Sequence, residues 1–297
     1  MRLSDFYSKH FSDLCCYEDY LMRVDLMGKK HNDKDLIDNL PGFLGANWKV
    51  IIAGGEIVWI DSATGERLND VSFLSEVTSY LFSYWNDLVI ADVPCFVDEI
   101  QQGAFYECEN LVKVNLPDRL TRIGVCAFRG CINLKSIRIP SNVREIGDYA
   151  FSSCFNLEHI ELPGNLCNIG SGVFLGCRKL VDVTIPSTLS CIPADMFKEC
   201  VNLKKIVIPE GVQHIEERAF LGCFCLNEIK LPESLEYIED SVFDGCRDLR
   251  TIRIPRNVKR IGYEAFARCD RLEHAEVPAG VSYGSFSFPP QCRVIEY

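Results

Sequence analysis

Hydrophobic positions recur every 23 residues over most of this chain. A phenylalanine keeps that step from Phe82 to Phe266, a proline from Pro94 to Pro278, and a cysteine from Cys108 to Cys292. A period of this length is typical of a solenoid, in which each repeat forms one coil and buries its apolar side chains against its neighbours. The pattern therefore predicts a solenoid over residues 73–297 with degenerate first and last coils.

One coil, residues 134–156, predicts the local structure of them all. Ile137 and Ile139 alternate with polar residues, which is the pattern of a strand with one buried face. Pro140 cannot donate a backbone hydrogen bond, so the strand ends there. The segment that contains Ala150 and Phe151 is long enough for about two helical turns, and a proline stands at its start in another coil. Each coil is predicted to contain a strand, a return and a short helix.

The two ends of the chain depart from this pattern. Residues 1–72 lack the period, and we expect them to form a helical segment and a β-hairpin that cap the solenoid or make a small accessory domain. Residues 3–27 have helical spacing, and two β-like runs flank Gly54-Gly55, which suits a tight hairpin turn. In the last coil, Pro289 is expected in the phenylalanine position, with Cys292 still in register.

The repeat L-x-x-I-x-I-P-x-x-V-x-x-I-G-x-x-A-F-x-x-C-x-x-L is filled position by position by Leu134 through Phe151, Cys154 and Leu157. It resembles the BspA-type leucine-rich repeats, also called the Treponema pallidum type, over about residues 74–297. The resemblance implies an α/β solenoid with a parallel sheet on the concave side and short helices on the convex side. It also implies a role outside catalysis, because bacterial relatives are mostly surface or secreted proteins that bind other proteins.

The chain is acidic, with a net charge of −11, and holds 47% hydrophobic residues. An acidic surface repels phosphate, so nucleic acid and anionic membranes are poor partners. No apolar run approaches the length of a membrane span.

The chain has sixteen cysteines, most of them in one position of the repeat. Equivalent side chains of stacked coils point the same way, so we predict buried free thiols rather than a disulfide framework. No C-x-x-C spacing occurs, and we predict neither a metal site nor a cofactor. Free thiols and the lack of a recognisable signal peptide favour a cytoplasmic location, the alternative being the cell surface or the extracellular space after removal of a leader.

The strand residues that point away from the core form the predicted binding face. Their charges are mixed and they include no aromatic residue, which disfavours carbohydrate and nucleic acid and favours a protein or peptide. A solvated face without a ligand is the other interpretation. The predicted partner-binding residues are Lys113, Asn115, Arg138, His159, Glu161, Asp182, Thr184, Lys205, Glu228, Lys230, Thr251, Arg253, His274 and Glu276.

The sequence predicts no catalytic residue. A G-x-S-x-G pattern at residues 280–284 lacks a downstream histidine, and coils of equal length leave no long loop for a catalytic group. We expect a protein-interaction scaffold. The alternatives are a secreted or surface adhesin, an adaptor whose activity lies in residues 1–72, and self-association through an end coil.

Overall fold

The structure is a computed structural model that describes residues 48–53, 56–61, 76–77, 82–84, 88–93, 95 and 97–297. The chain divides into two compact units, Met1–Val71 and Ser72–Tyr297. In the first unit, β1 (Trp48–Ala53) and β2 (Glu56–Asp61) form the predicted antiparallel hairpin. The helical segment predicted over residues 3–27 lies outside the described residues.

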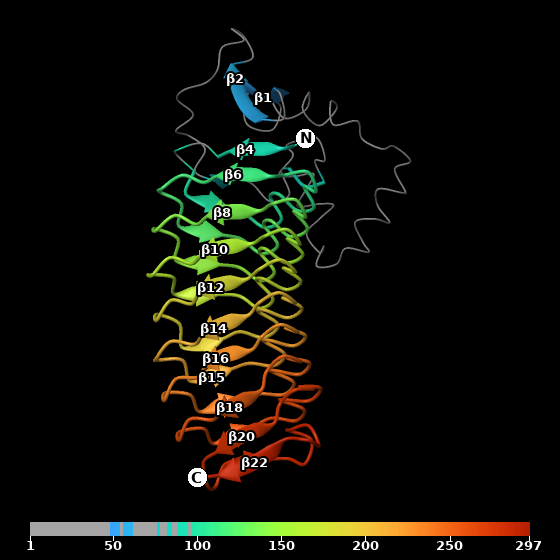
Figure 1. The fold of residues 1–297 in the computed structure, drawn as a ribbon. Helices are drawn as coiled ribbons and strands as arrows, with labels where there is room; N and C mark the ends of the chain where they lie inside the picture. Colours follow the sequence, from blue (N-terminus) through green and yellow to red (C-terminus); the bar gives the residue numbers. More distant parts are fainter. Residues whose placement is uncertain are drawn as a thin grey trace, which may run out of the picture. The chain divides into compact units, whose positions relative to one another are not determined.

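The second unit is a stack of coils whose strands follow one another in two parallel ladders, each of which is divided into separate hydrogen-bonded sheets (Figure 1). The first, called here the long-strand ladder, contains β4 (Ile90–Asp92), β6 (Lys113–Asn115), β8 (Ser136–Arg138), β10 (His159–Glu161), β12 (Asp182–Thr184), β14 (Lys205–Val207), β16 (Glu228–Lys230), β18 (Thr251–Arg253), β20 (His274–Val277) and β22 (Arg293–Glu296). Ile137 pairs with Ile160 and Ile160 with Val183, so the 23-residue period of the sequence is the register of the sheet.

The second ladder, called here the short-strand ladder, was not predicted as strand. It contains β3 (Glu76–Val77), β5 (Glu99–Ile100), β7 (Arg122–Ile123), β9 (Glu145–Ile146), β11 (Asn168–Ile169), β13 (Cys191–Ile192), β15 (His214–Ile215), β17 (Tyr237–Ile238), β19 (Arg260–Ile261) and β21 (Ser282–Tyr283). These strands form two five-stranded sheets that are separated between β11 and β13. Pro193 lies at this break. It has no N–H group, whereas Gly170 and Glu216 in the same position donate to the preceding coil.

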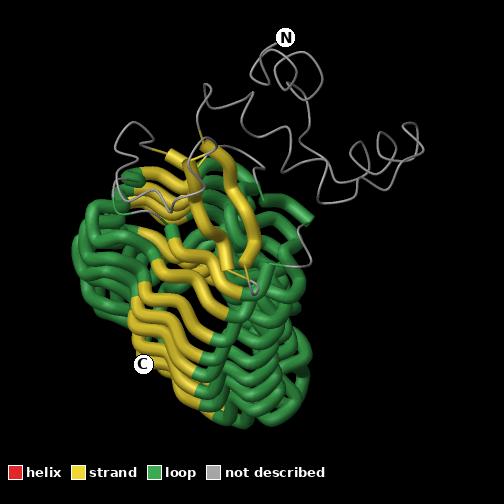
Figure 2. Tube along the Cα trace, turned by 90° about the horizontal axis from the view of Figure 1, so that it is seen from above, coloured by secondary structure: helices red, strands yellow, loops and turns green. Residues whose placement is uncertain are grey.

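The third side of each coil, called here the turn side, corrects the prediction of a short helix. The described residues contain no helix, and none of them therefore forms one that could cross a membrane (Figure 2). Tyr149 and Ser153, which flank Phe151 at two residues' distance, have φ values of 56° and 59° and cannot belong to an α-helix. The N–H groups of Tyr149, Phe151 and Ser153 donate to carbonyls of the next coil instead of to the preceding helical turn. The turn side is therefore a third set of hydrogen bonds between coils.

The interior consists of columns of identical side chains. Phenylalanine rings from Phe82 to Phe266 are at most 1% exposed and stack with centroid distances of 5.1 to 6.0 Å. A parallel column of thiols runs from Cys108 to Cys269, fully buried, and every described cysteine is unpaired. The prediction of buried free thiols is confirmed for this column.

The last coil is shorter than the sequence period indicated. Phe288, and not Pro289, stacks on Phe266 at 5.1 Å between ring centroids. Glu276 pairs with Ile295, a step of 19 residues (295 − 276), so the coil has lost four residues relative to the others. Cys292, in this last coil, is only half-buried, unlike the thiols from Cys108 to Cys269. A terminal coil has no following neighbour, so nothing holds it to the common register.

Candidate functional site

The outward side chains of the long-strand ladder form a continuous polar surface, called here the strand face. In most strands the middle residue is buried and the two flanking residues are exposed. The structure places all the predicted partner-binding residues there, on the strands from β6 to β20: Lys113, Asn115, Arg138, His159, Glu161, Asp182, Thr184, Lys205, Glu228, Lys230, Thr251, Arg253, His274 and Glu276. The strand pairing brings neighbours of successive coils together and keeps residues of distant coils apart.

Hydrogen bonds and ion pairs between successive strands engage part of the strand face. His159 Nδ1 lies 3.0 Å from Asp182 Oδ1, and Arg253 Nη1 lies 3.3 Å from Glu276 Oε2. Lys205 contacts Glu228 in the same way. All of these side chains are about half exposed or more, so each pair contributes at most about 1 kcal/mol. His159 thus pairs with the next coil, not with Glu161 of its own strand.

A shallow groove crosses the strand face over β10, β12 and β14, with a volume of about 570 Å³. His159, Asp182 and Lys205 line it together with Val207, whose side chain is 47% exposed. Val207 gives this part of a polar surface an apolar contact point. A groove of this size and openness suits an extended peptide better than an enclosed small molecule.

The strand face extends further than the sequence predicted. Asp92 on β4 lies within it and accepts a hydrogen bond from Asn115. Arg293 and Ile295 on β22 continue it at the other end, beside His274 and Glu276. Sequence reasoning missed these two because it kept the 23-residue register through the shortened last coil.

The short-strand ladder brings Asn168, Cys191 and His214 into successive outward positions. These residue types occur together in thiol hydrolases, where the cysteine must ionise. Here burial, with Glu216 nearby, raises the pKa of the Cys191 thiol. The ring of His214 stacks on Tyr237 at 4.8 Å between ring centroids. Cys191 therefore stays protonated at neutral pH, which does not suit a nucleophile.

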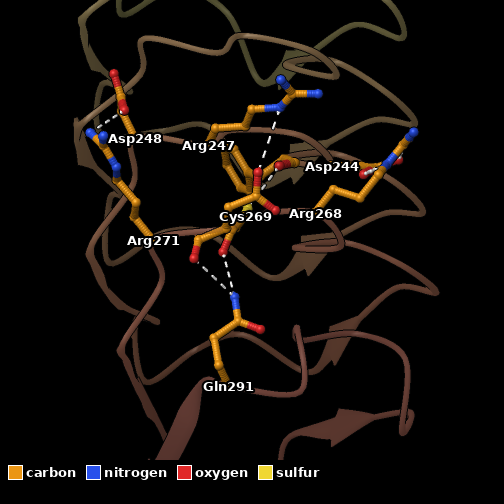
Figure 3. Close-up of polar contacts among 9 residues, drawn as sticks. Asp244, Arg247, Asp248, Arg268, Cys269, Arg271 and Gln291 are labelled. Atoms are coloured by element: carbon orange, nitrogen blue, oxygen red, sulfur yellow. Dashed lines mark hydrogen bonds and ion pairs between the residues drawn. The ribbon is translucent and has the colours of Figure 1, made fainter.

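The turn side carries two ion pairs in which an arginine binds a buried carboxylate through two N–H groups. Asp244 is 3% exposed and binds both the Nε and an Nη of Arg268 (Figure 3), and Asp195 is held in the same way by Arg218. The two carboxylates raise the pKa of both arginines. Among the described residues, no three His, Cys, Asp or Glu side chains are arranged to hold a metal ion.

Coils of 23 residues, a parallel ladder on the strand face and columns of buried side chains define a solenoid repeat protein. The chain belongs to the BspA-type leucine-rich repeat family, because the model of that family matches residues 75–204 and 190–296 in six copies. This confirms the resemblance inferred from the repeat.

Several solved structures are similar to the array. A leucine-rich repeat protein of T. pallidum is 27% identical over 68% of this chain and 87% of its own, with a TM-score of 0.46. A leucine-rich cell surface protein of Faecalibacterium prausnitzii is 20% identical over 85% of this chain and 93% of its own, with a TM-score of 0.38. The pneumococcal vaccine antigen PcpA is 19% identical over 84% of this chain and 86% of its own, with a TM-score of 0.46. Among curated proteins, none matches this chain.

Proposed function

We propose that this protein is a non-enzymatic scaffold that binds a protein or peptide on the strand face, taken as the concave side of the solenoid. The observation that carries the proposal is the regular array of exposed polar side chains on the long-strand ladder, together with the groove that contains the exposed Val207. Such a surface is fixed before binding, so little conformational entropy is lost on association.

Charged side chains of the strand face that have no ion-pair partner there are the candidates for binding residues. Lys205 and Arg253 form ion pairs with Glu228 and Glu276, and His159 forms a hydrogen bond with Asp182. In the described part of the chain, Lys113, Arg138 and Lys230 make no such pair. These three cations are available to a partner, and we propose that its contact surface carries carboxylates.

The proposal is tested with the full chain as bait in an extract of its source organism. A strand-face variant, Arg138→Ala combined with Lys230→Ala, is compared with a turn-side control, Arg271→Ala, whose arginine is also exposed. A partner retained by the control and lost by the strand-face variant supports the proposal. A partner retained equally by both variants contradicts it.

We propose that residues 1–72 form a cap or accessory domain rather than the binding site. The array from residue 73 should then capture the same partner as the full chain. Capture by residues 1–72 alone would instead support the adaptor function.

We propose a reducing, cytoplasmic location, supported by the unpaired cysteines. Cell-surface or extracellular display is the alternative. Thiol titration of protein taken from its native source distinguishes the two, because export would convert accessible thiols such as Cys95 and Cys167 into disulfides or mixed disulfides.

A further inference from the structure

The turn side contains a hollow of about 480 Å³ that the strand face does not reach. Its floor is made by Gly222 and Gly245, which occupy the left-handed position two residues after the core phenylalanine in successive coils, with φ values of 75° and 76°. Glu199 and Arg268 fill the same position in the coils on either side. A Cβ at Gly245 would meet nothing closer than 3.7 Å, so the two missing side chains create the hollow.

One wall of the hollow is apolar. Phe224 is 40% exposed, although most phenylalanines of the array are fully buried. Val201 and Leu221 line the same space. Leaving a phenylalanine this exposed on a folded array gives up part of its burial free energy, which a ligand would recover by covering the ring.

Three arginines line the hollow beside this apolar wall, together with the carboxylates of Glu199 and Asp244. The guanidinium of Arg247 lies 4.5 Å from the centre of the Phe224 ring, and Asp270 approaches it only to 3.7 Å. Arg178 lies over Phe155 at 4.8 Å, and no carboxylate pairs with it in the part of the chain that the structure describes. Arg268 is held by the buried Asp244. An arginine stacked on a ring keeps its N–H groups free at the edge, where they can donate to an anion.

We propose that this hollow is a second binding site, which takes an acidic peptide segment carrying an apolar side chain next to a carboxylate. The apolar side chain would lie over the glycine floor against Phe224. The carboxylate would accept hydrogen bonds from Arg178 and Arg247. Charge-assisted hydrogen bonds of guanidinium to carboxylate are among the stronger ones in proteins, and the volume is within the usual range of ligand sites.

The site is independent of the strand face. Its residues come from the turn side of the coils, and none of them lines the groove over β10, β12 and β14. If binding to one of these sites is not observed, the proposal for the other site is therefore unaffected.

Fluorescence anisotropy with a labelled peptide, acetyl-Ser-Glu-Leu-Asp-Ser-amide, tests the ligand class on the full chain. We expect it to bind at least tenfold more tightly than the same peptide with Gln and Asn in place of Glu and Asp. Arg178→Gln and Arg247→Gln should each weaken binding about fivefold or more, whereas Lys205→Gln on the strand face should not change it. Equal binding of the acidic and amide peptides would overturn the proposal.

A matched pair of variants tests the position of the ligand. Gly245→Gln fills the hollow without adding charge, and Glu199 shows that a side chain of this length is accepted in the same backbone conformation. Gly176→Gln makes the same change in an equivalent position with φ of 73° that does not line the hollow. We expect Gly245→Gln to abolish peptide binding and Gly176→Gln to preserve it.

Binding that survives Gly245→Gln would place the ligand elsewhere and contradict the proposal. If Gly245→Gln fails to fold, the two arginine variants decide the question. Self-association of the wild-type protein without peptide binding would identify a second copy as the occupant and would also overturn the proposal.

Discussion

From Phe105 to Phe243, the carbonyl group of each core phenylalanine accepts two hydrogen bonds. Phe174 O accepts the backbone N–H of Cys177 at 3.0 Å and the thiol of Cys200, one coil further on, at 3.1 Å. Cysteine is small enough for the dry interior and has a weak donor that reaches this oxygen. The sequence predicted buried free thiols from the period alone, but the acceptor could not be predicted, because it depends on how far one coil lies above the next.

Replacing a phenylalanine in the middle of its column should be strongly destabilising. Phe174→Ala removes a ring that is in contact with Phe151 and Phe197 and leaves a cavity between rigid coils. We expect a loss of about 3–5 kcal/mol in the free energy of unfolding, measured by urea denaturation. The exposed Val207 is the control, and Val207→Ala should change stability by less than about 0.5 kcal/mol. Similar losses in the two variants would contradict the buried column.

The thiol column should make the protein sensitive to alkali. Burial raises the pKa of Cys154 and of Cys269 from 9.0 to about 12, and the pKa values of neighbouring column thiols are raised as well. The folded state thus keeps protons that the unfolded state releases above pH 9. The thiol contribution to stability is complete below pH 9 and is lost as pH rises from 9 towards 12, at up to about 1.4 kcal/mol per pH unit for each thiol.

Denaturation midpoints at pH 8, 9, 10 and 11 measure this slope. The double variant Cys154→Ala, Cys269→Ala lacks two of the thiols, so its stability should fall less steeply, by up to about 2.7 kcal/mol per pH unit. A slope equal to that of the wild type would mean that these thiols ionise as easily in the folded state as in the unfolded one.

The sequence predicted the long strands correctly. It did not predict the short strands, and it predicted a helix on the turn side, where the structure has turns. Ile137 and Ile139 alternate with polar residues and end at a proline, which marks a strand directly. The short strand Glu145–Ile146 has two residues, too few to show an alternation. The turn side has the composition and length of a helix, and the contrary signal is the glycine that recurs at Gly130, Gly176, Gly222 and Gly245. Glycine at that position indicates a left-handed residue, which ends any helix.

Successive coils approach each other closely at Gly147, directly after the short strand Glu145–Ile146. A Cβ on Gly147 would lie 2.6 Å from the backbone nitrogen of Val125, so Gly147→Ala must push two coils apart. We expect a loss of about 1–3 kcal/mol in the free energy of unfolding. Gly164, where an added Cβ meets nothing within 4 Å, is the control, and Gly164→Ala should be close to neutral by thermal denaturation. Equal effects would show that the coils are not packed this tightly.

For the molecule as a whole, the repeat predicted the family and the array, and the alternation of the long strands predicted which residues are exposed on the strand face. The sequence did not predict the identity of the partner, because the solenoid fold is compatible with many different ligands. The hollow between Glu199 and Arg268 also escaped prediction, since it exists only when two glycines occupy successive left-handed positions on a side that was expected to be helical. The shortening of the last coil was not predicted either. The cysteine of that coil keeps the 23-residue spacing in the sequence, although the strand pairing shows that the coil is four residues shorter.

Pulse labelling of the native full-length protein with a maleimide, followed by mass spectrometry of each cysteine, tests the buried columns most directly. Cys95 and Cys167 are exposed and should react within the pulse. The column from Cys108 to Cys269 should stay unlabelled until denaturant unfolds the array. Labelling of the column cysteines as fast as Cys167, or their recovery as disulfide-linked pairs, would contradict an interior built from stacked thiol and phenylalanine side chains.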